Sequence, residues 1–223
     1  MSSTFEAKKA LIVHAHPESA SFCTSQMQAA RDELVRQGYE VDVIDLYENK
    51  LDPVLDRGEF EHVEEPFKPQ DEHLKAIKAG TLKPRIREDI DRVLAADLLV
   101  FSFPLWWFSV PAILKGWVDR VFVTGAVFGG DYGILDEAAL VGKRAVVLTT
   151  TGGPEDMYSE DGALAPIESF LFHVNEGIFR FVGYEPLKPV VTYGPAHLDD
   201  EQREKALGAV RSEFEKIDER PRA

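Results

Sequence analysis

The stretch DLLVFSFPLWWFSVPAILKGWVDRVF, residues 97–122, predicts a strand, a loop and a helix in succession. Residues 97–103 are a short apolar run without polar alternation, which is typical of a strand buried on both faces of a parallel sheet. Three large aromatic residues flanked by prolines follow, before the helix expected at 111–121. An aromatic run usually belongs to a core, but ligands of α/β sheets bind where strands end. We therefore expect this loop to hold a planar heteroaromatic ring.

The same alternation of strands and helices extends to both sides of this stretch. Strands are expected at residues 10–15, 40–46, 97–103, 145–150 and 189–193, and helices at 24–37, 70–79, 84–94, 111–121, 165–181 and 199–217. The run at 40–46 alternates polar and apolar residues, as an edge strand with one wetter face does. The pattern predicts an α/β fold with an open, doubly wound parallel sheet.

The whole chain, 1–223, is expected to form a single domain. Residues 47–83 mix prolines with acidic residues and are expected to leave the fold and pack on another part of it. Residues 122–142 form a second long connection, rich in glycine. Together these two segments account for most of the chain beyond a minimal five-stranded α/β unit.

The composition indicates an acidic globular protein. Of its 223 residues 44% are apolar, and 39 acidic residues against 25 basic ones give a net charge of −14. That charge argues against a nucleic-acid partner, because phosphate backbones recruit basic surfaces. No apolar run is long enough to enter a membrane, and one cysteine with no evident signal peptide favours the cytoplasm. The acidic residues concentrate in 59–72, 155–168 and 199–219, which are interpreted as solvated faces.

The loop after the first strand, residues 16–23, has the chemistry of a phosphate site. It carries a histidine, the hydroxyls of Ser19 and Ser21, and backbone amides at the start of a helix, although it lacks the glycine or lysine of common nucleotide loops. An ordinary loop with a serine helix cap remains the alternative.

The loop after the fourth strand, residues 149–154, contains the paired glycines Gly152 and Gly153. Glycines let a ligand approach the backbone closely, although such a pair is most often a simple turn. Tyr158 follows closely, and its phenol would stabilise charge on a reduced ring.

A flavin nucleotide would explain all three loops: its phosphates would lie at the first, its ring at the second and the polar edge of the ring at the third. A flavin carries redox chemistry itself, so the protein needs no catalytic acid–base pair. The histidines are scattered without ligand spacing, so no metal site is expected.

Residues 103–122 resemble the signature of the NAD(P)H:quinone oxidoreductases, the DT-diaphorase-like enzymes of flavodoxin-like fold. The match includes ALIVHAHPESASF at 10–22, TTGG at 150–153 and MYS at 157–159, and it runs in register from about residue 9 to 217. The resemblance implies the strand order 2-1-3-4-5 with helices on both faces. It also implies an FAD-bound homodimer, with FMN the less favoured flavin. Such an enzyme passes two electrons from NADH or NADPH to a small quinone, and nitro or azo compounds would fit the same pocket.

Carried over residue by residue, the resemblance assigns a set of site residues. Those expected to bind the cofactor are His16, Ser21, Phe22, Cys23, Pro104, Leu105, Trp106, Trp107, Phe108, Thr150, Thr151, Gly152, Gly153, Tyr158 and Arg203. Those expected to act in catalysis are Tyr158, Gly152 and Gly153. Those expected to bind substrate are Trp107, Phe108, Phe128 and Met157, with Phe128 reaching the partner subunit's site.

The chain departs from the family pattern at Leu164, where the family has a histidine that stabilises charge on the flavin. Acidic residues at 155–168, with no base nearby, disfavour a donor with a 2′-phosphate and so weakly favour NADH. A different class of function also stays open. The chain would then be a flavin-bearing regulatory or electron-carrier protein with incidental turnover, and its acidic stretches would be docking surfaces.

Overall fold

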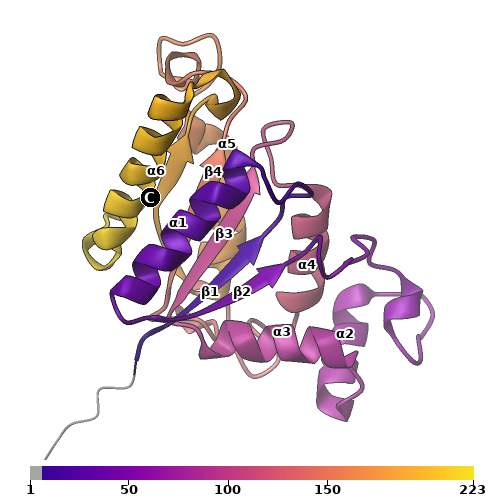
Figure 1. The fold of residues 1–223 in the computed structure, drawn as a ribbon. Helices are drawn as coiled ribbons and strands as arrows, with labels where there is room; N and C mark the ends of the chain where they lie inside the picture. The colour runs from indigo at the N-terminus through magenta and orange to yellow at the C-terminus, as the bar shows by residue number, and fades with distance from the viewer. Residues whose placement is uncertain (1–6) are drawn as a thin grey trace, which may run out of the picture.

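The computed structural model describes residues 7–223, and its centre is a five-stranded parallel sheet (Figure 1). The strands are β1 (Lys9–His14), β2 (Glu40–Asp45), β3 (Leu98–Pro104), β4 (Arg144–Thr150) and β5 (Glu185–Thr192). Their order, β2-β1-β3-β4-β5, confirms the predicted doubly wound sheet, with β2 at one edge.

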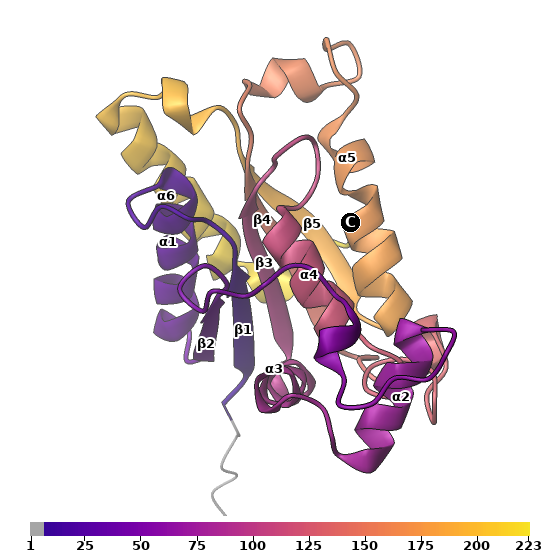
Figure 2. The same ribbon diagram turned by 90° about the vertical axis from the view of Figure 1, so that its right-hand side faces the viewer.

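Helices cover both faces of the sheet, as predicted (Figure 2). They are α1 (Phe22–Arg36), α2 (Pro69–Ala79), α3 (Pro84–Ala95), α4 (Ala112–Val121), α5 (Ile167–Val174) and α6 (Asp200–Glu215). Side chains alternate between the faces along each strand. Ile12 and Val100 therefore lie in the core with α1 and α6, whereas Leu11 and Phe101 lie in the core with α3, α4 and α5.

The strand register brings the predicted loops to one edge of the sheet. His14, the last residue of β1, pairs with Asp45 on one side and Ser102 on the other. At the same edge, Thr150 pairs with Pro104 and Thr192. The chain reverses its winding between β1 and β3, so the loops after β1, β3 and β4 meet at the switch point of the sheet.

The fifth strand is longer than predicted, because it begins at Glu185 rather than near residue 189. Two prolines, Pro186 and Pro189, lie within the observed strand. Proline is tolerated here because β5 is an edge strand. The C-terminal segment occupies part of its outer edge, where Lys188 N donates to Pro221 O at 2.9 Å and Ala223 N to Pro186 O at 3.0 Å.

The continuous helix predicted for residues 165–181 is wrong. The α-helical part of α5 ends at Val174, and the chain continues through a π-helical turn, Asn175–Phe179, and a 3₁₀ turn, Arg180–Val182. Phe179 is fully buried against Phe101, with ring centroids 4.8 Å apart. The wider turn accompanies this burial, and sequence periodicity does not encode such a change of pitch.

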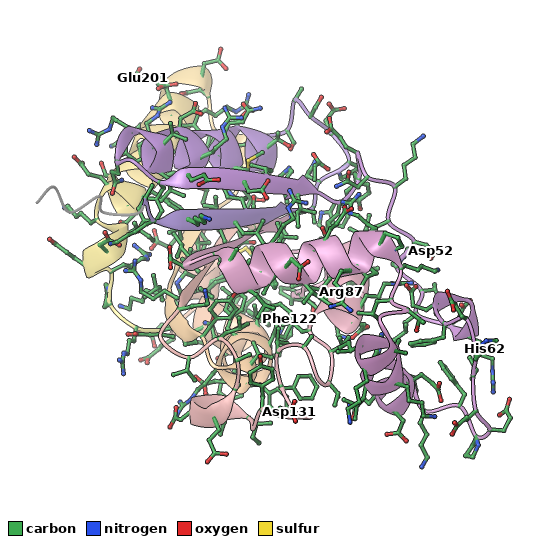
Figure 3. All side chains as sticks on the ribbon, turned by 90° about the horizontal axis from the view of Figure 1, so that it is seen from below. Asp52, His62, Arg87, Phe122, Asp131 and Glu201 are labelled. Atoms are coloured by element: carbon green, nitrogen blue, oxygen red, sulfur yellow. The ribbon has the colours of Figure 1, made fainter. Side chains whose placement is uncertain are left out.

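The excursion at 47–83 packs on α4. Pro53 lies so close to this helix that a Cβ on Gly116 would sit 2.3 Å from the Pro53 carbonyl oxygen. Arg120 of α4 donates to Glu59 Oε2 at 3.0 Å, which ties the excursion to the helix through a buried ion pair. Figure 3 shows Asp52 and His62 of this segment away from the strands of the sheet.

No helix within residues 7–223 is long and apolar enough to cross a membrane.

Candidate functional site

The loop after β1 is held in one shape by its own hydrogen bonds. Ser21 caps α1, because its Oγ accepts from Thr24 N at 3.1 Å, and Glu18 Oε1 accepts from Ala20 N at 2.9 Å. In the described part of the chain, the amides of Phe22 and Cys23 have no hydrogen-bond partner, as is usual in the first turn of a helix. Two unpaired amides at the positive end of a 15-residue helix are suited to an anion.

A cavity of about 450 Å³ opens at this helix end. It is lined by His16, Ala20, Ser21, Phe22, Cys23, Ser25, Thr150, Pro195, Ala196, Arg203 and Leu207. Six of the predicted cofactor residues therefore come together from the loop after β1 and the start of α1, from the end of β4 and from α6. Sequence reasoning missed Pro195, Ala196 and Leu207, because small and apolar residues carry no chemical signal. Only their place after the fifth strand could have indicated them.

The aromatic loop after β3 begins at the same edge. Leu105 N donates to Thr150 O at 2.8 Å, and the Trp106 ring lies 6.0 Å from the His16 ring. Trp107 and Phe108 have φ angles of 51° and 58°, in the left-handed region that costs a bulky residue conformational energy. The loop is thus held in a strained shape, the kind of outlier that clusters at ligand sites.

Contacts with α5 support this loop from outside. The Phe108 ring stacks on Phe170 with centroids 4.7 Å apart, and Ser109 Oγ lies 3.2 Å from His173 Nε2. Trp107, by contrast, is 94% exposed. We expected ligand contact along the whole aromatic run, but in the protein alone Trp107 projects into solvent.

The loop after β4 presents the predicted catalytic residues together. Thr151 Oγ1 donates to Gly153 O at 2.7 Å, and Thr151 N donates to Thr192 O at 3.1 Å. A Cβ on Gly153 would lie 2.8 Å from Met157 Sδ, which places the Met157 side chain directly against this glycine. These contacts fix the backbone that faces the site.

Tyr158 lies beside these glycines, with its ring packed between Phe170 and Tyr193 at centroid distances of 6.2 and 5.8 Å. Within residues 7–223 its hydroxyl has no protein hydrogen-bond partner, so the hydroxyl is free for a ligand. Leu164 donates its backbone amide to Met157 O at 2.9 Å and offers no side-chain donor.

The electrostatics at the first loop combine a cation with neutral buried groups. Burial raises the pKa of the Cys23 thiol to about 12, opposed by Ser102 and Thr150, so Cys23 is a neutral thiol at physiological pH. Arg203 of α6 is half exposed, and its Nε lies 3.4 Å from Pro195 O. In residues 7–223 no group of three or more metal-ligating side chains is present.

Phe128, a predicted substrate residue, lies apart from the strand-end loops that carry the other predicted site residues of the same chain. It lines a separate cavity of about 620 Å³ together with Phe67, His73 and Phe122. Its ring contacts Phe181 edge to face, with centroids 5.1 Å apart.

Known proteins resemble this chain in both sequence and fold. Residues 8–217 match the family model described as flavodoxin-like fold. The chain is 39% identical to NAD(P)H dehydrogenase (quinone) 1 of Cavia porcellus over 219 residues, covering 96% of the chain and 79% of the relative. It is 40% identical to ribosyldihydronicotinamide dehydrogenase (quinone) of Homo sapiens over 205 residues, covering 91% and 88%. A crystal structure of a Klebsiella pneumoniae protein described as a quinone reductase superposes with a TM-score of 0.88 at 31% identity, covering 97% and 87%.

Proposed function

The chain belongs to the flavodoxin-like family of NAD(P)H:quinone oxidoreductases, and we propose that it is a homodimeric, FAD-containing enzyme that reduces quinones with NADH or NADPH. A bound flavin would supply the redox chemistry, namely hydride transfer from the donor and two-electron reduction of the acceptor. The chain's own residues bind and orient the reactants and stabilise charge.

The cavity at the start of α1 is the observation that carries this proposal. It combines the unpaired amides of Phe22 and Cys23 with the guanidinium of Arg203, and these donors are suited to phosphate oxygens. The aromatic loop begins within contact distance of the same cavity, because the Trp106 and His16 rings are neighbours. A phosphate site beside an aromatic platform fits a flavin nucleotide.

The length of the cavity favours FAD over FMN. FMN ends at one phosphate, whereas FAD continues through a second phosphate to adenosine. The cavity extends from the α1 amides to Pro195 and Ala196, in the turn before α6, and to Arg203 in the first turn of α6, and these residues would contact the second phosphate and the adenosine. A helix end alone would serve a single phosphate equally well.

Ring binding is assigned to Pro104, Leu105, Trp106, Trp107 and Phe108. The buried Leu105 fixes the start of this loop, and the strain at Trp107 and Phe108 holds its backbone open. The loop after β4 serves the polar edge of the ring, with Thr150, Thr151, Gly152 and Gly153 as its backbone wall.

Tyr158 takes the role of the charge-stabilising donor. Its hydroxyl is free, and Leu164 cannot share the task that a histidine would share. The phenol and the loop amides therefore act alone on developing negative charge.

A homodimer would complete the substrate pocket. Phe128 lies in a cavity of its own, while Trp107, Phe108 and Met157 belong to the loops at the other site. Pairing two chains so that each Phe128 faces the other chain's aromatic loop would unite the predicted substrate residues and cover Trp107. We expect an interface of about 2,000 Å² or more. Sedimentation of the flavin-loaded protein as a stable monomer would contradict this assembly.

The proposal is tested first by the cofactor that purified protein retains. We expect a yellow protein that releases FAD on denaturation, and release of FMN would correct the flavin. A colourless protein that takes up neither flavin would overturn the proposal.

Because the protein has one cysteine and it is buried, we place the enzyme in the reducing cytoplasm, which fractionation of the source cells would check.

Anaerobic mixing separates an enzyme from an electron carrier. NADH and NADPH, with dihydronicotinamide riboside as the donor indicated by the human relative's name, are each added to the oxidised protein, followed by a benzoquinone. Rapid bleaching by a donor and recovery of colour with quinone supports the reductase. Bleaching by none of the three donors would leave the regulatory or carrier function as the better reading.

A matched pair of arginine variants on α6 tests the proposed placement of FAD. Replacing Arg203 by glutamine is expected to weaken FAD binding about tenfold, the usual cost of a charged hydrogen bond, and to leave FMN binding unchanged. Replacing Arg211, whose partner is Glu204 on the outer face at 3.1 Å, is the control and should alter neither affinity. Equal FAD affinities for the two variants would remove Arg203 from the cofactor site.

A further inference from the structure

A buried polar network lies beneath the cofactor loop and is used by none of the roles above. His14, at the end of β1, has no exposed surface. Its Nδ1 lies 3.0 Å from Ser102 Oγ of β3, and its Nε2 lies 3.1 Å from Thr24 Oγ1 of α1. Thr24 Oγ1 also lies 3.0 Å from Ser21 Oγ and 3.0 Å from the carbonyl oxygen of Glu18. One imidazole thus connects the sheet to the loop that forms the phosphate site.

Proton counting assigns the tautomer of this imidazole. The Thr24 hydroxyl has one proton, and a carbonyl can only accept, so that proton goes to Glu18 O. Thr24 Oγ1 then acts only as an acceptor toward its other neighbours, so His14 Nε2 and Ser21 Oγ both donate to it. In a neutral ring, Nδ1 is left as the acceptor and takes the Ser102 hydroxyl proton. In this assignment each of the four contacts joins one donor to one acceptor.

We propose that neutral His14, as its Nε2–H tautomer, is a positioning residue that holds the 16–23 loop in the shape that binds the cofactor's diphosphate. This inference rests on the proposed function. His14 fixes Thr24, and Thr24 in turn fixes Glu18 O and the capping residue Ser21. The amides of Phe22 and Cys23 follow directly on Ser21, so their direction depends on the same chain of bonds.

The surroundings of His14 keep it neutral. Burial lowers its pKa and His16 from the loop lowers it further, whereas the carboxylate of Asp45 at the end of β2 and the Ser102 backbone raise it, and the net shift is downward. Asp45 is itself engaged, since its Oδ1 accepts from Tyr47 N at 3.0 Å and Glu48 N at 3.1 Å. The remaining titratable neighbour is Cys23, a neutral thiol that adjoins Ser102.

Two substitutions of similar shape distinguish the contact made by Nδ1 of the His14 ring from the contact made by Nε2. Glutamine places an amide donor at the Nε2 position and keeps the bond to Thr24, whereas asparagine reaches only the Nδ1 position. We expect His14→Gln to hold the dissociation constant for FAD within about threefold of wild type. His14→Asn and His14→Leu should raise it about tenfold, in line with the loss of one buried hydrogen bond.

The affinity for riboflavin distinguishes a positioning role of His14 from a role in supporting the core. Riboflavin has the flavin ring but no phosphate, so loss of the loop's shape should leave its affinity unchanged in all three variants. Equal losses for FAD and riboflavin, following the melting temperatures of the apoproteins, would mean that His14 only supports the core. Equal FAD affinities for His14→Gln and His14→Asn would also overturn the proposal.

Nitrogen-15 spectra of the unliganded wild-type protein at pH 7 test the tautomer without any cofactor. We expect the Nε2–H form, and an Nδ1–H form or an imidazolium would refute the assignment even if every variant failed to fold. Failure of wild type to bind FAD and riboflavin would sink the proposed function instead. The two outcomes are therefore distinguishable.

Discussion

Replacing Arg120 by methionine should destabilise the protein more than any surface substitution, because it leaves a buried carboxylate without its main partner. Arg120 and Glu59 have side chains only 4% and 8% exposed. The guanidinium also donates to Gly116 O at 3.0 Å and to Val54 O. These contacts make it the main electrostatic link between α4 and the 47–83 excursion.

The expected loss in the free energy of unfolding depends on which partners Glu59 keeps after Arg120 is replaced. Removing one partner of a buried ion pair costs about 3–5 kcal/mol. Lys83 Nζ lies 3.5 Å from Glu59 Oε2 and is half exposed, so it can approach and recover part of the loss. We therefore expect about 3 kcal/mol, which for a chain of this length lowers the melting temperature by roughly 6–12 °C.

Urea unfolding of the apoprotein at 25 °C measures this free energy, and limited proteolysis locates it. Cleavage should move into 47–83 at urea concentrations that leave the sheet intact. The control is the double variant Arg120→Met with Glu59→Leu, which removes both charges and should recover most of the stability, since an apolar pair can replace a buried ion pair. A loss below about 1 kcal/mol for Arg120→Met, or a double variant as unstable as the sum of the single ones, would refute the reasoning.

Three further predictions concern single groups. Tyr158→Phe should slow bleaching of the bound flavin by NADH about tenfold in stopped flow, and an unchanged rate would move charge stabilisation to the loop amides. The pKa of Asp218 is raised by burial but lowered more by Lys8, Tyr39 and Arg144, and the net shift is downward. Its carboxylate therefore stabilises the fold above about pH 4, and that stabilisation is lost as the pH falls further, so Asp218→Asn should flatten the acid arm of the urea stability profile. Because burial raises the pKa of Cys23 to about 12, iodoacetamide at pH 8 should modify the native thiol at least about a hundredfold more slowly than the urea-unfolded one, as followed by mass spectrometry, and equal rates would contradict the burial of Cys23.

Much of the fold could be predicted from sequence because its signals are local. The unbroken apolar runs of β1, β3 and β4 indicate strands covered on both faces, and the alternation in β2 indicates an edge. The signal failed where tertiary contacts override local preference. Pro186 and Pro189 are tolerated because β5 is an edge strand partly covered by the C-terminal segment, and α5 widens where Phe179 enters the core.

The candidate site likewise contains residues that the sequence indicated and residues that only the structure reveals. Residues 16–23, the aromatic run and the paired glycines could be picked out because each follows a strand, and strand ends share one edge of a parallel sheet. Leucine, alanine and proline residues of the cavity, such as Leu207, Ala196 and Pro195, have no chemical signature and emerge only from packing.

The sequence by itself determined that this is a doubly wound α/β domain whose three strand-end loops have the chemistry of a flavin site, because burial periodicity and residue type are local properties. Only the tertiary structure decided that Pro195, Ala196 and Leu207 line the cavity at the start of α1, that Phe128 lies in a separate cavity, and that His14 joins Ser102 to Thr24. These relations depend on which side chains face one another across the sheet. Such pairings arise from the packing of residues far apart in the chain, and no local pattern records them.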